Sequence, residues 1–381
     1  MTGCFYPHLG GLVTDVYEIS SRLVKMGYET DIVVCNTKKA APHEQLEGMN
    51  IYRLDSWNML HGEYAIPQPT LRNFRILGSM LKKEHNLVHV YTRFYINSSL
   101  GLLISRLKGV PLLYTELGVG HVVSSSKLVS LLARTYDHSL GTLLVKSANK
   151  VVVICQASIP FLRHLGLRKA ALAIPFAVNE TIFKRSENNL RERLGLEKAI
   201  VVTSACRLIY AKGVQDLILA YPRIKREIPA ARILIVGSGE YETELKTLAR
   251  TIDEEGIRFL GGKSAQEVAQ ILSITDIAVS TSYSEGLSAS VLEASAMGLP
   301  VVATNVGGTP EIIQDQETGM LFEPGDVGAL AAIICQVAKN KDLAKKLGDA
   351  ARQATAEKFN WDHIVQCYSE VIDSMSQKSG G

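Results

Sequence analysis

Short apolar runs alternate along the whole chain with longer segments in which apolar residues recur every three or four positions. The short runs predict buried strands, and the longer segments predict amphipathic helices. The strands are expected near residues 29–35, 50–54, 87–91, 111–115, 150–154 and 171–174, and then near 199–206, 232–236, 257–260, 276–280, 300–303 and 319–322. Strands that alternate with helices in this way indicate an α/β fold built on mostly parallel, doubly wound sheets.

The helices of the first half are expected near residues 13–26, 70–84, 97–107, 128–147 and 156–165. The fourth of them carries Leu131 and Leu132 next to Arg134. Apolar residues with flanking positive charge fit either a helix that rests on a membrane or one that packs on the core. Both alternatives stay open at this point.

Two alternating series in 381 residues predict two domains, because one core rarely serves a chain of this length. We expect a first domain over residues 1–183, a second domain over 184–357, and a C-terminal helical segment over 358–377.

The composition, 46% hydrophobic and 21% charged, is that of a globular protein. There is no apolar run long enough for a transmembrane helix and no signal-peptide pattern at the start. The six cysteines are scattered without C-x-x-C pairs, which favours a reducing compartment over a zinc site or a disulfide framework. We therefore expect a cytoplasmic protein. His85 and His89 stand four positions apart, but they straddle the start of a strand, so we predict no metal site.

The net charge of +3 is unevenly divided along the chain. Residues 1–185 contain 21 Lys and Arg against 12 Asp and Glu, whereas residues 186–381 contain 20 against 26. The basic first half suggests an anionic partner, either a phospholipid surface or a phosphate-bearing acceptor, and no nucleic acid is expected. A chance asymmetry on a solvated surface is the alternative.

The stretch from Ser280 to Glu311 places polar groups where an α/β sheet binds ligands. Glu285 lies in the loop at the end of a predicted strand, and Glu293 lies inside the following helix. Gly286 and the backbone N–H groups at the helix start suit a phosphate, and those N–H groups belong to Leu287, Ser288, Ala289 and Ser290. This arrangement invites recognition of a sugar nucleotide, although two glutamates eight positions apart are also common as solvated helix charges.

The whole string resembles the signature of the retaining family 4 glycosyltransferases, in which two such glutamates precede P-V-V-A-T and V-G-G-x-P-E segments. The resemblance implies the GT-B architecture, two Rossmann-like domains that face each other across a cleft, with a last helix that crosses back to the first domain. It also implies that Glu285 orients the donor sugar and that Glu293 holds the ribose.

Arg207 and Lys212 lie in a segment similar to the family's G-R-L-x-x-x-K-G motif, in which both cations hold the donor diphosphate. Two fixed cations stabilise the charge that develops on the departing diphosphate. The chain contains no D-x-D, so the resemblance implies neither a metal requirement nor a cofactor. Gly237 follows a strand in the loop that faces the donor in this family, and Gly261 lies in a segment whose backbone meets the nucleobase.

The opening of the chain departs from the family in one respect. Gly10 and Gly11 resemble the loop where the backbone approaches the donor phosphate, but only four residues stand where a first strand is expected. We expect a truncated first strand, a sheet without its central strand and a less stable domain.

A second departure from the family follows the strand at 111–115, where relatives often carry a His near the donor sugar. Either Glu116 or His121 takes that polar role, or catalysis is impaired.

These features predict a metal-independent, retaining hexosyl- or N-acetylhexosaminyltransferase that uses a UDP or GDP sugar. The acceptor is expected to be a lipid or a glycan, and a peripheral place on an anionic membrane is the corresponding expectation. Two alternatives are kept: a non-catalytic or partner-dependent subunit that binds a nucleotide sugar but turns over poorly, and a nucleotide-sugar epimerase of the same GT-B architecture.

Overall fold

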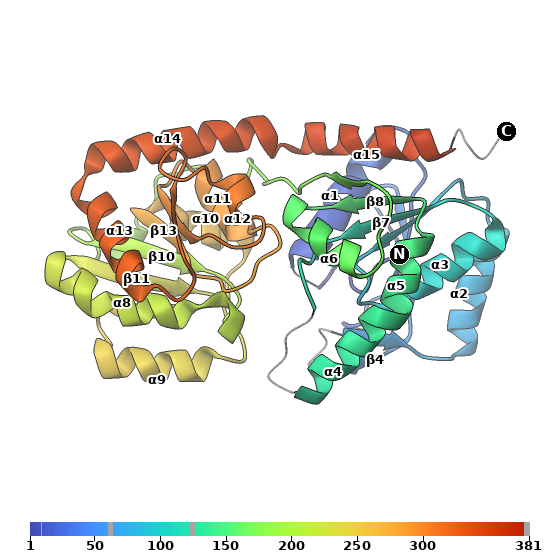
Figure 1. Ribbon diagram of the computed structural model, residues 1–381, viewed down its shortest axis with the longest axis horizontal. Helices are drawn as coiled ribbons and strands as arrows, with labels where there is room; N and C mark the ends of the chain where they lie inside the picture. The colour runs from blue at the N-terminus through green and yellow to red at the C-terminus, as the bar shows by residue number, and fades with distance from the viewer. Residues whose placement is uncertain (9, 60–63, 122–126, 377–381) are drawn as a thin grey trace. The chain divides into compact units, whose positions relative to one another are not determined.

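The computed structural model describes residues 1–8, 10–59, 64–121 and 127–376, without the side chains of residues 127–129. The chain forms two compact units (Figure 1). The first contains Met1–Phe176 and the C-terminal segment from Trp361, and the second contains Ala177–Asn360. The divisions therefore fall a few residues away from the boundaries at 183 and 357 that the sequence pattern suggested.

The second unit is built on a six-stranded parallel sheet in the order β12-β11-β10-β13-β14-β15. Its strands are β10 (Ile200–Ala205), β11 (Ala231–Val236), β12 (Ile257–Gly261), β13 (Ile277–Ser280), β14 (Val301–Thr304) and β15 (Met320–Phe322). The strand order reverses direction between β10 and β13. Ligands bind at the carboxyl ends of the strands at such a switch point.

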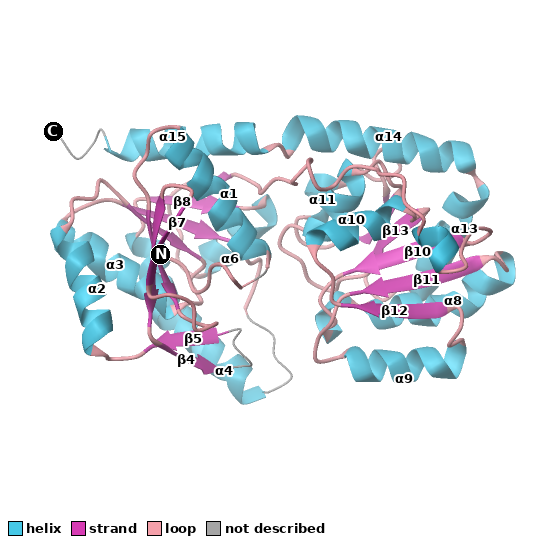
Figure 2. Cartoon of the chain, turned by 180° about the vertical axis from the view of Figure 1, so that it is seen from behind, coloured by secondary structure: helices cyan, strands magenta, loops and turns pink. Residues whose placement is uncertain are grey.

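Helices cover this sheet (Figure 2), and alternate residues of its strands pack against two different groups of helices. Val202 and Ile233 pack with α8 (Val214–Glu227), α9 (Glu242–Ile252) and α13 (Val327–Lys339). Val201 and Leu234 pack on the other face with α10 (Ala265–Ser273). The period of two in the strands thus buries both faces of the sheet, as a doubly wound fold requires. The remaining helices of this unit are α7 (Leu190–Arg193), η4 (Tyr210–Lys212), α11 (Ala289–Ala296), α12 (Thr309–Ile312) and α14 (Lys341–Lys358).

The first unit contains two sheets and a hairpin. The parallel strands β6, β7, β8 and β9 form one sheet, and β1-β3-β2 forms another in which β2 runs antiparallel. The bounds are β1 (Asp31–Cys35), β2 (His43–Leu46), β3 (Met49–Leu54), β4 (Ser56–Met59), β5 (Tyr64–Pro67), β6 (Val88–Tyr91), β7 (Leu112–Glu116), β8 (Lys150–Val153) and β9 (Ala171–Ala173). The antiparallel pair β4-β5 and the edge strand β2 were not predicted, because β2 and β4 carry exposed polar residues and β5 is only four residues long.

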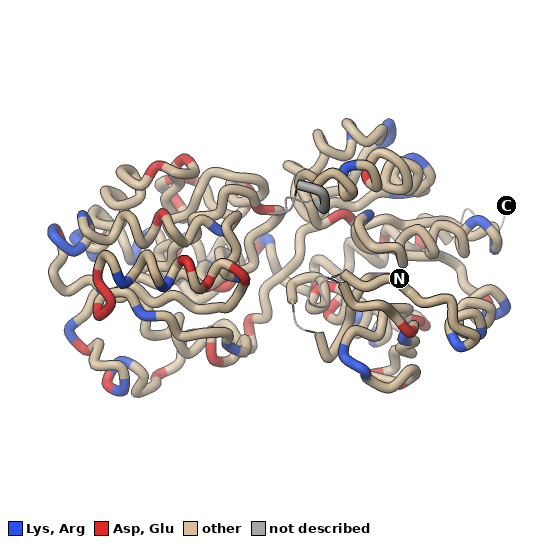
Figure 3. Tube along the Cα trace, turned by 90° about the horizontal axis from the view of Figure 1, so that it is seen from below, with Lys and Arg blue, Asp and Glu red and all other residues tan. Residues whose placement is uncertain are grey.

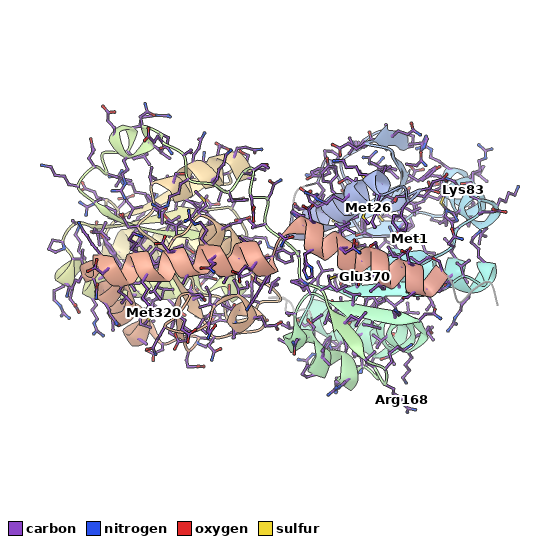
Figure 4. The ribbon with its side chains drawn as sticks, turned by 90° about the horizontal axis from the view of Figure 1, so that it is seen from above. Met1, Met26, Lys83, Arg168, Met320 and Glu370 are labelled. Carbon is purple, nitrogen blue, oxygen red and sulfur yellow. The ribbon has the colours of Figure 1, made fainter. Side chains whose placement is uncertain are left out.

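Residues Met1–Cys4 join these two sheets. The N–H of Thr2 donates to the Val33 carbonyl of β1 at 3.2 Å, and the Tyr91 N–H of β6 donates to the Met1 carbonyl at 3.2 Å. The expectation of a sheet without its central strand is therefore corrected, since these residues occupy the place between β1 and β6. Met1 and Lys83, which are labelled in Figure 4, both line a cavity of about 560 Å³ in this unit.

The C-terminal helix α15 (Trp361–Ser376) packs on α1 (Gly11–Lys25) within the first unit. The Arg22 guanidinium lies 5.3 Å from the Trp361 ring centre, and the Tyr28 hydroxyl donates to Asp373 at 2.7 Å. The segment predicted as one helix over 128–147 is instead α4 (Lys127–Tyr136), the π-helix η2 (Asp137–Gly141) and α5 (Thr142–Ser147). The other helices are α2 (Leu71–Lys82), α3 (Ile96–Lys108), η3 (Gln156–Ser158) and α6 (Ile159–His164). None of the described helices is long and apolar enough to cross a membrane.

Candidate active site

An ion pair spans the switch point of the second sheet. Lys212 ends the turn η4 after β10, and Glu285 lies in the loop after β13. The Lys212 ammonium donates to both carboxylate oxygens of Glu285, at 2.8 and 2.6 Å, and the two side chains are 22% and 10% exposed. Two residues predicted from separate motifs are thus brought together where a ligand is expected.

Two glycines allow the backbone around this pair to approach closely. Gly213 has φ +63°, and a Cβ there would lie 2.0 Å from the Thr281 carbonyl oxygen. Gly307 has φ +52°, and a Cβ there would lie 1.7 Å from the Glu285 carbonyl oxygen. Any side chain at either position would therefore push the Glu285 loop away from its neighbours.

Helix α11 begins directly after the loop that carries Glu285. Its N-cap residue Ser288 makes no side-chain capping bond within the described part of the chain. The backbone N–H groups of the first turn therefore keep their hydrogen-bonding capacity for a ligand. The predicted residues Gly286, Leu287 and Ala289 all lie at this helix start, and the Gly286 carbonyl is held by the Gly308 N–H at 2.7 Å.

Glu293 is the fifth residue of α11, just over one turn from the helix start, and is half-buried. Its burial raises the pKa of the carboxyl to about 8. Among the described residues its side chain has no hydrogen-bonding or ionic partner. A partly buried carboxyl without a partner is unfavourable in the free protein, and it suits a ligand that brings hydroxyl donors.

Arg207 is exposed on the loop that follows β10. The next residue, Leu208, is buried, and its N–H donates to the Ser238 carbonyl at 2.9 Å. Gly237 is needed for packing, because a Cβ there would lie 1.8 Å from the Cys206 carbonyl oxygen. The Gly237 N–H donates to the Gly261 carbonyl at 2.9 Å, so the ends of β10, β11 and β12 are held together at this edge.

The other predicted residues belong to the first unit. Gly10 is the N-cap of α1 and Gly11 its first residue, and both are exposed. Glu116, the last residue of β7, is completely buried and accepts from the backbone N–H groups of Leu117 and Gly118 at 3.0 and 2.8 Å. It also accepts from Arg93 at 2.7 Å and from the Tyr114 hydroxyl.

These contacts give Glu116 a structural role, since its carboxylate is occupied and has no exposed surface. The alternative that Glu116 replaces the missing His at the donor sugar is therefore corrected. His121 has a side chain that is 21% exposed, and its Nδ1 lies 2.7 Å from Asp137 Oδ2. Of the two residues, His121 is the one that a ligand can reach.

Comparison with known proteins places these features in a family. A model described as "Glycosyl transferases group 1" matches residues 186–354, and one described as "Glycosyltransferase Family 4" matches residues 9–179. Together they cover most of the chain. The protein belongs to the family 4 glycosyltransferases, and its two Rossmann-like units form the GT-B fold.

Two relatives that match over nearly the full length of this chain support its assignment to the glycosyltransferases. An uncharacterised glycosyltransferase of Methanocaldococcus jannaschii is 28% identical, over 98% of this chain and 97% of that protein. The GDP-mannose-dependent alpha-(1-6)-phosphatidylinositol monomannoside mannosyltransferase of Mycobacterium tuberculosis is 26% identical, with the same two shares. The structure of Anabaena HepE in complex with UDP and glucose has a TM-score of 0.79 at 19% identity, covering 98% of each chain.

The sequence pattern of this glycosyltransferase missed a buried charge network in the first unit. Arg93 donates from Nε to Asp137 at 2.8 Å and from Nη2 to the Gly120 carbonyl at 2.7 Å. Burial alone would lower the pKa of Arg93, but its anionic neighbours Glu116 and Asp137 hold that pKa above its ordinary value. The position of Arg93 just after β6 was the available signal, since polar residues at strand ends often serve a site.

Proposed function

We propose that this glycosyltransferase moves a hexose from a nucleoside diphosphate sugar to a lipid or glycan acceptor, with retention of configuration and without a metal ion or cofactor. The observation that carries the proposal is the Lys212–Glu285 pair at the switch point, next to the open start of α11. A cation, a carboxylate and free helix N–H groups at one sheet edge match the parts of a nucleotide sugar.

The donor is proposed to bind with its diphosphate over the first turn of α11. The N–H groups there and the Lys212 ammonium donate hydrogen bonds to the phosphate oxygens, and Arg207 supplies a second positive charge at the same edge of the sheet. The two ribose hydroxyls donate to the unpartnered carboxyl of Glu293. In the complex, the Glu285 carboxylate keeps its contact with Lys212 and also accepts hydrogen bonds from the hydroxyls of the sugar.

The negative charge that develops on the leaving diphosphate explains why Lys212 and Arg207 should increase the rate of sugar transfer. Cleavage of the glycosidic bond increases the negative charge on the leaving diphosphate, and fixed positive groups stabilise that state more than the ground state. The proposed independence of a metal ion rests on this local supply of positive charge.

We propose that retention arises in a single displacement in which the acceptor attacks from the face of the leaving group, without a covalent glycosyl-enzyme intermediate. We assign the acceptance of its proton to the leaving diphosphate oxygen, which is the base closest to that face. This part rests on the family resemblance, and the anomeric configuration of the product, read by NMR, tests it.

The proposed acceptor is an anionic lipid or a glycan that is attached to an anionic lipid. The first half of the chain is basic (Figure 3), and the helical segment α4–η2–α5 exposes Leu131, Leu132, Leu140 and Leu143. Exposed leucines with nearby Arg134 and Lys146 suit a membrane surface with anionic headgroups. One relative is named as a GDP-mannose-dependent phosphatidylinositol monomannoside mannosyltransferase, so we would try GDP-mannose and a phosphatidylinositol-type acceptor first.

Thermal stabilisation tests the donor site directly. UDP, GDP, ADP and their sugars are added with and without EDTA, and we expect one nucleotide sugar to raise the melting temperature in both conditions. Lys212→Ala should abolish most of that shift, whereas Lys246→Ala, which removes an exposed lysine of the same unit, should not. A shift that needs Mg²⁺, or that survives Lys212→Ala, would overturn the proposed diphosphate site.

A further inference from the structure

Three histidines from three different elements converge in the first unit. His121 lies in the loop after β7, His138 is the second residue of the π-helix η2, and His164 ends α6. One ring nitrogen from each lies within 4.8 Å of the other two. The ring centres are 5.4 Å apart for His121 and His138, and likewise for His138 and His164.

A buried carboxylate orients the first of these imidazoles. Asp137 is completely buried, and its Oδ2 lies 2.7 Å from Nδ1 of His121. Because the Arg93 guanidinium also binds Asp137, at 2.8 Å, the carboxylate is fixed in position next to the imidazole. In the tautomer in which Nδ1–H of His121 donates to Asp137, the lone pair of the ring is on Nε2 and available to a metal ion. This carboxylate–histidine arrangement is the one that orients metal-ligating histidines.

Packing fixes the same ring from a second side. The Phe161 ring meets the His121 ring edge-on at 4.9 Å, and the Arg93 guanidinium covers Phe161 at 4.4 Å. Asp137 and His138 are consecutive residues of the π-helix η2, and Asp137 is buried whereas His138 is exposed. π-Helical segments are rare in proteins, and those that occur are frequently found at functional sites.

We propose that His121, His138 and His164 bind one divalent transition-metal ion, with Zn²⁺ the first choice. Tetrahedral Zn²⁺ with Zn–N bonds of about 2.0–2.1 Å needs nitrogens roughly 3.3–3.4 Å apart. His138 and His164 are exposed, so small rotations of their side chains close the remaining distance. The three ligands leave a fourth position, which a water molecule or an anion fills.

The chemistry of the donors sets the selectivity. All three ligand atoms are imidazole nitrogens, which favour Zn²⁺, Cu²⁺, Ni²⁺ and Co²⁺ over the oxygen-seeking Mg²⁺ and Ca²⁺. The spacings of 17 and 26 residues match no short metal motif, so the sequence alone did not reveal the site. The residues belong to the first unit, and none of them is part of the diphosphate site proposed in the second unit.

The test measures Zn²⁺ binding by isothermal titration calorimetry on the full chain without a polyhistidine tag. We expect one Zn²⁺ per chain in the parent protein. His138→Gln and His164→Gln should each weaken that binding at least about tenfold, because loss of a ligand costs no less than loss of its outer-shell partner. His43→Gln, at an exposed position on β2 outside the cluster, serves as the matched control and should leave the affinity unchanged.

Co²⁺ provides a second readout that a general surface effect would not reproduce. Bound Co²⁺ should show the visible absorption of tetrahedral coordination in the parent protein and lose it in the His138→Gln/His164→Gln double variant. Absence of stoichiometric Zn²⁺ binding in the parent, or unchanged binding in the double variant, would overturn the proposal. Donor-induced thermal shifts report on the other unit, so the outcome here is separate from that of the proposed transfer activity.

Discussion

At the scale of single residues, Glu293 carries the clearest conflict between stability and ligand binding. Its carboxyl has a pKa of about 8 in the folded protein, against an ordinary value of 4.5. The unfolded chain therefore loses this proton at lower pH than the folded chain. The stability that the protein has at low pH falls as the pH rises from about 4.5 towards 8.

Glu293→Gln should relieve this destabilisation. We expect the free energy of unfolding at pH 7.5 to rise by about 1–3 kcal/mol, allowing for partial solvent exposure, and to change little at pH 4.5. Urea denaturation at the two pH values measures the effect. Glu317→Gln, at an exposed position of the same unit, is the control and should be neutral at both. An equal gain at both pH values would show that the pKa of Glu293 is not the cause.

Donor binding should release protons for the same reason. Ribose hydroxyls donate to the ionised carboxylate and thereby lower the pKa of Glu293 in the complex. We expect nucleotide affinity to increase with pH up to about 8 and to level off above it. Calorimetry at pH 7 in two buffers of different ionisation enthalpy counts the protons released. Zero release in the parent protein, or the same release in Glu293→Gln, would contradict the assignment.

At the scale of elements, the positions of the second unit's motifs on strands, loops and helices were predictable because each motif is local. Glu285, Glu293 and the start of α11 belong to one strand–loop–helix segment, and the period of the apolar residues places each of them. The break in the predicted helix over 128–147 was not visible in the same way. Asp137 lies in this π-helix, and its buried carboxylate is paired with Arg93 and His121, which both lie in other segments of the chain.

The loop of Glu285 depends on one close backbone approach, which a glycine variant tests. Gly307→Ala should lower the free energy of unfolding by about 2–4 kcal/mol and reduce donor binding, because its Cβ would overlap the Glu285 carbonyl. Gly195→Ala is the matched control: Gly195 has φ +63°, and no described atom lies within 4 Å of its added Cβ. We expect only the conformational cost there, about 1 kcal/mol, with donor binding intact. Chemical denaturation and nucleotide titration measure both effects, and equal losses would refute the contact.

At the scale of the whole molecule, charge and exposed apolar surface predict membrane binding by the first unit. Leu131→Glu/Leu132→Glu should weaken binding to vesicles that contain phosphatidylglycerol at least about tenfold, since both leucines are 61% exposed and available to the bilayer. Leu219→Glu changes a leucine that is 47% exposed in the second unit and should have no effect. Co-sedimentation at two salt concentrations measures binding. Equal binding to neutral phosphatidylcholine vesicles would exclude the electrostatic part.

Sequence alone determined the α/β class, the two alternating series and the polar residues that follow the strands of the second unit. These features depend on local periodicity, which records the buried face of each segment. The tertiary structure decided which distant residues meet. It paired Lys212 with Glu285 and buried Glu116 against Arg93. It also gathered three histidines from three elements. Such distances follow from strand order and helix packing, for which no local pattern in the chain carries a signal.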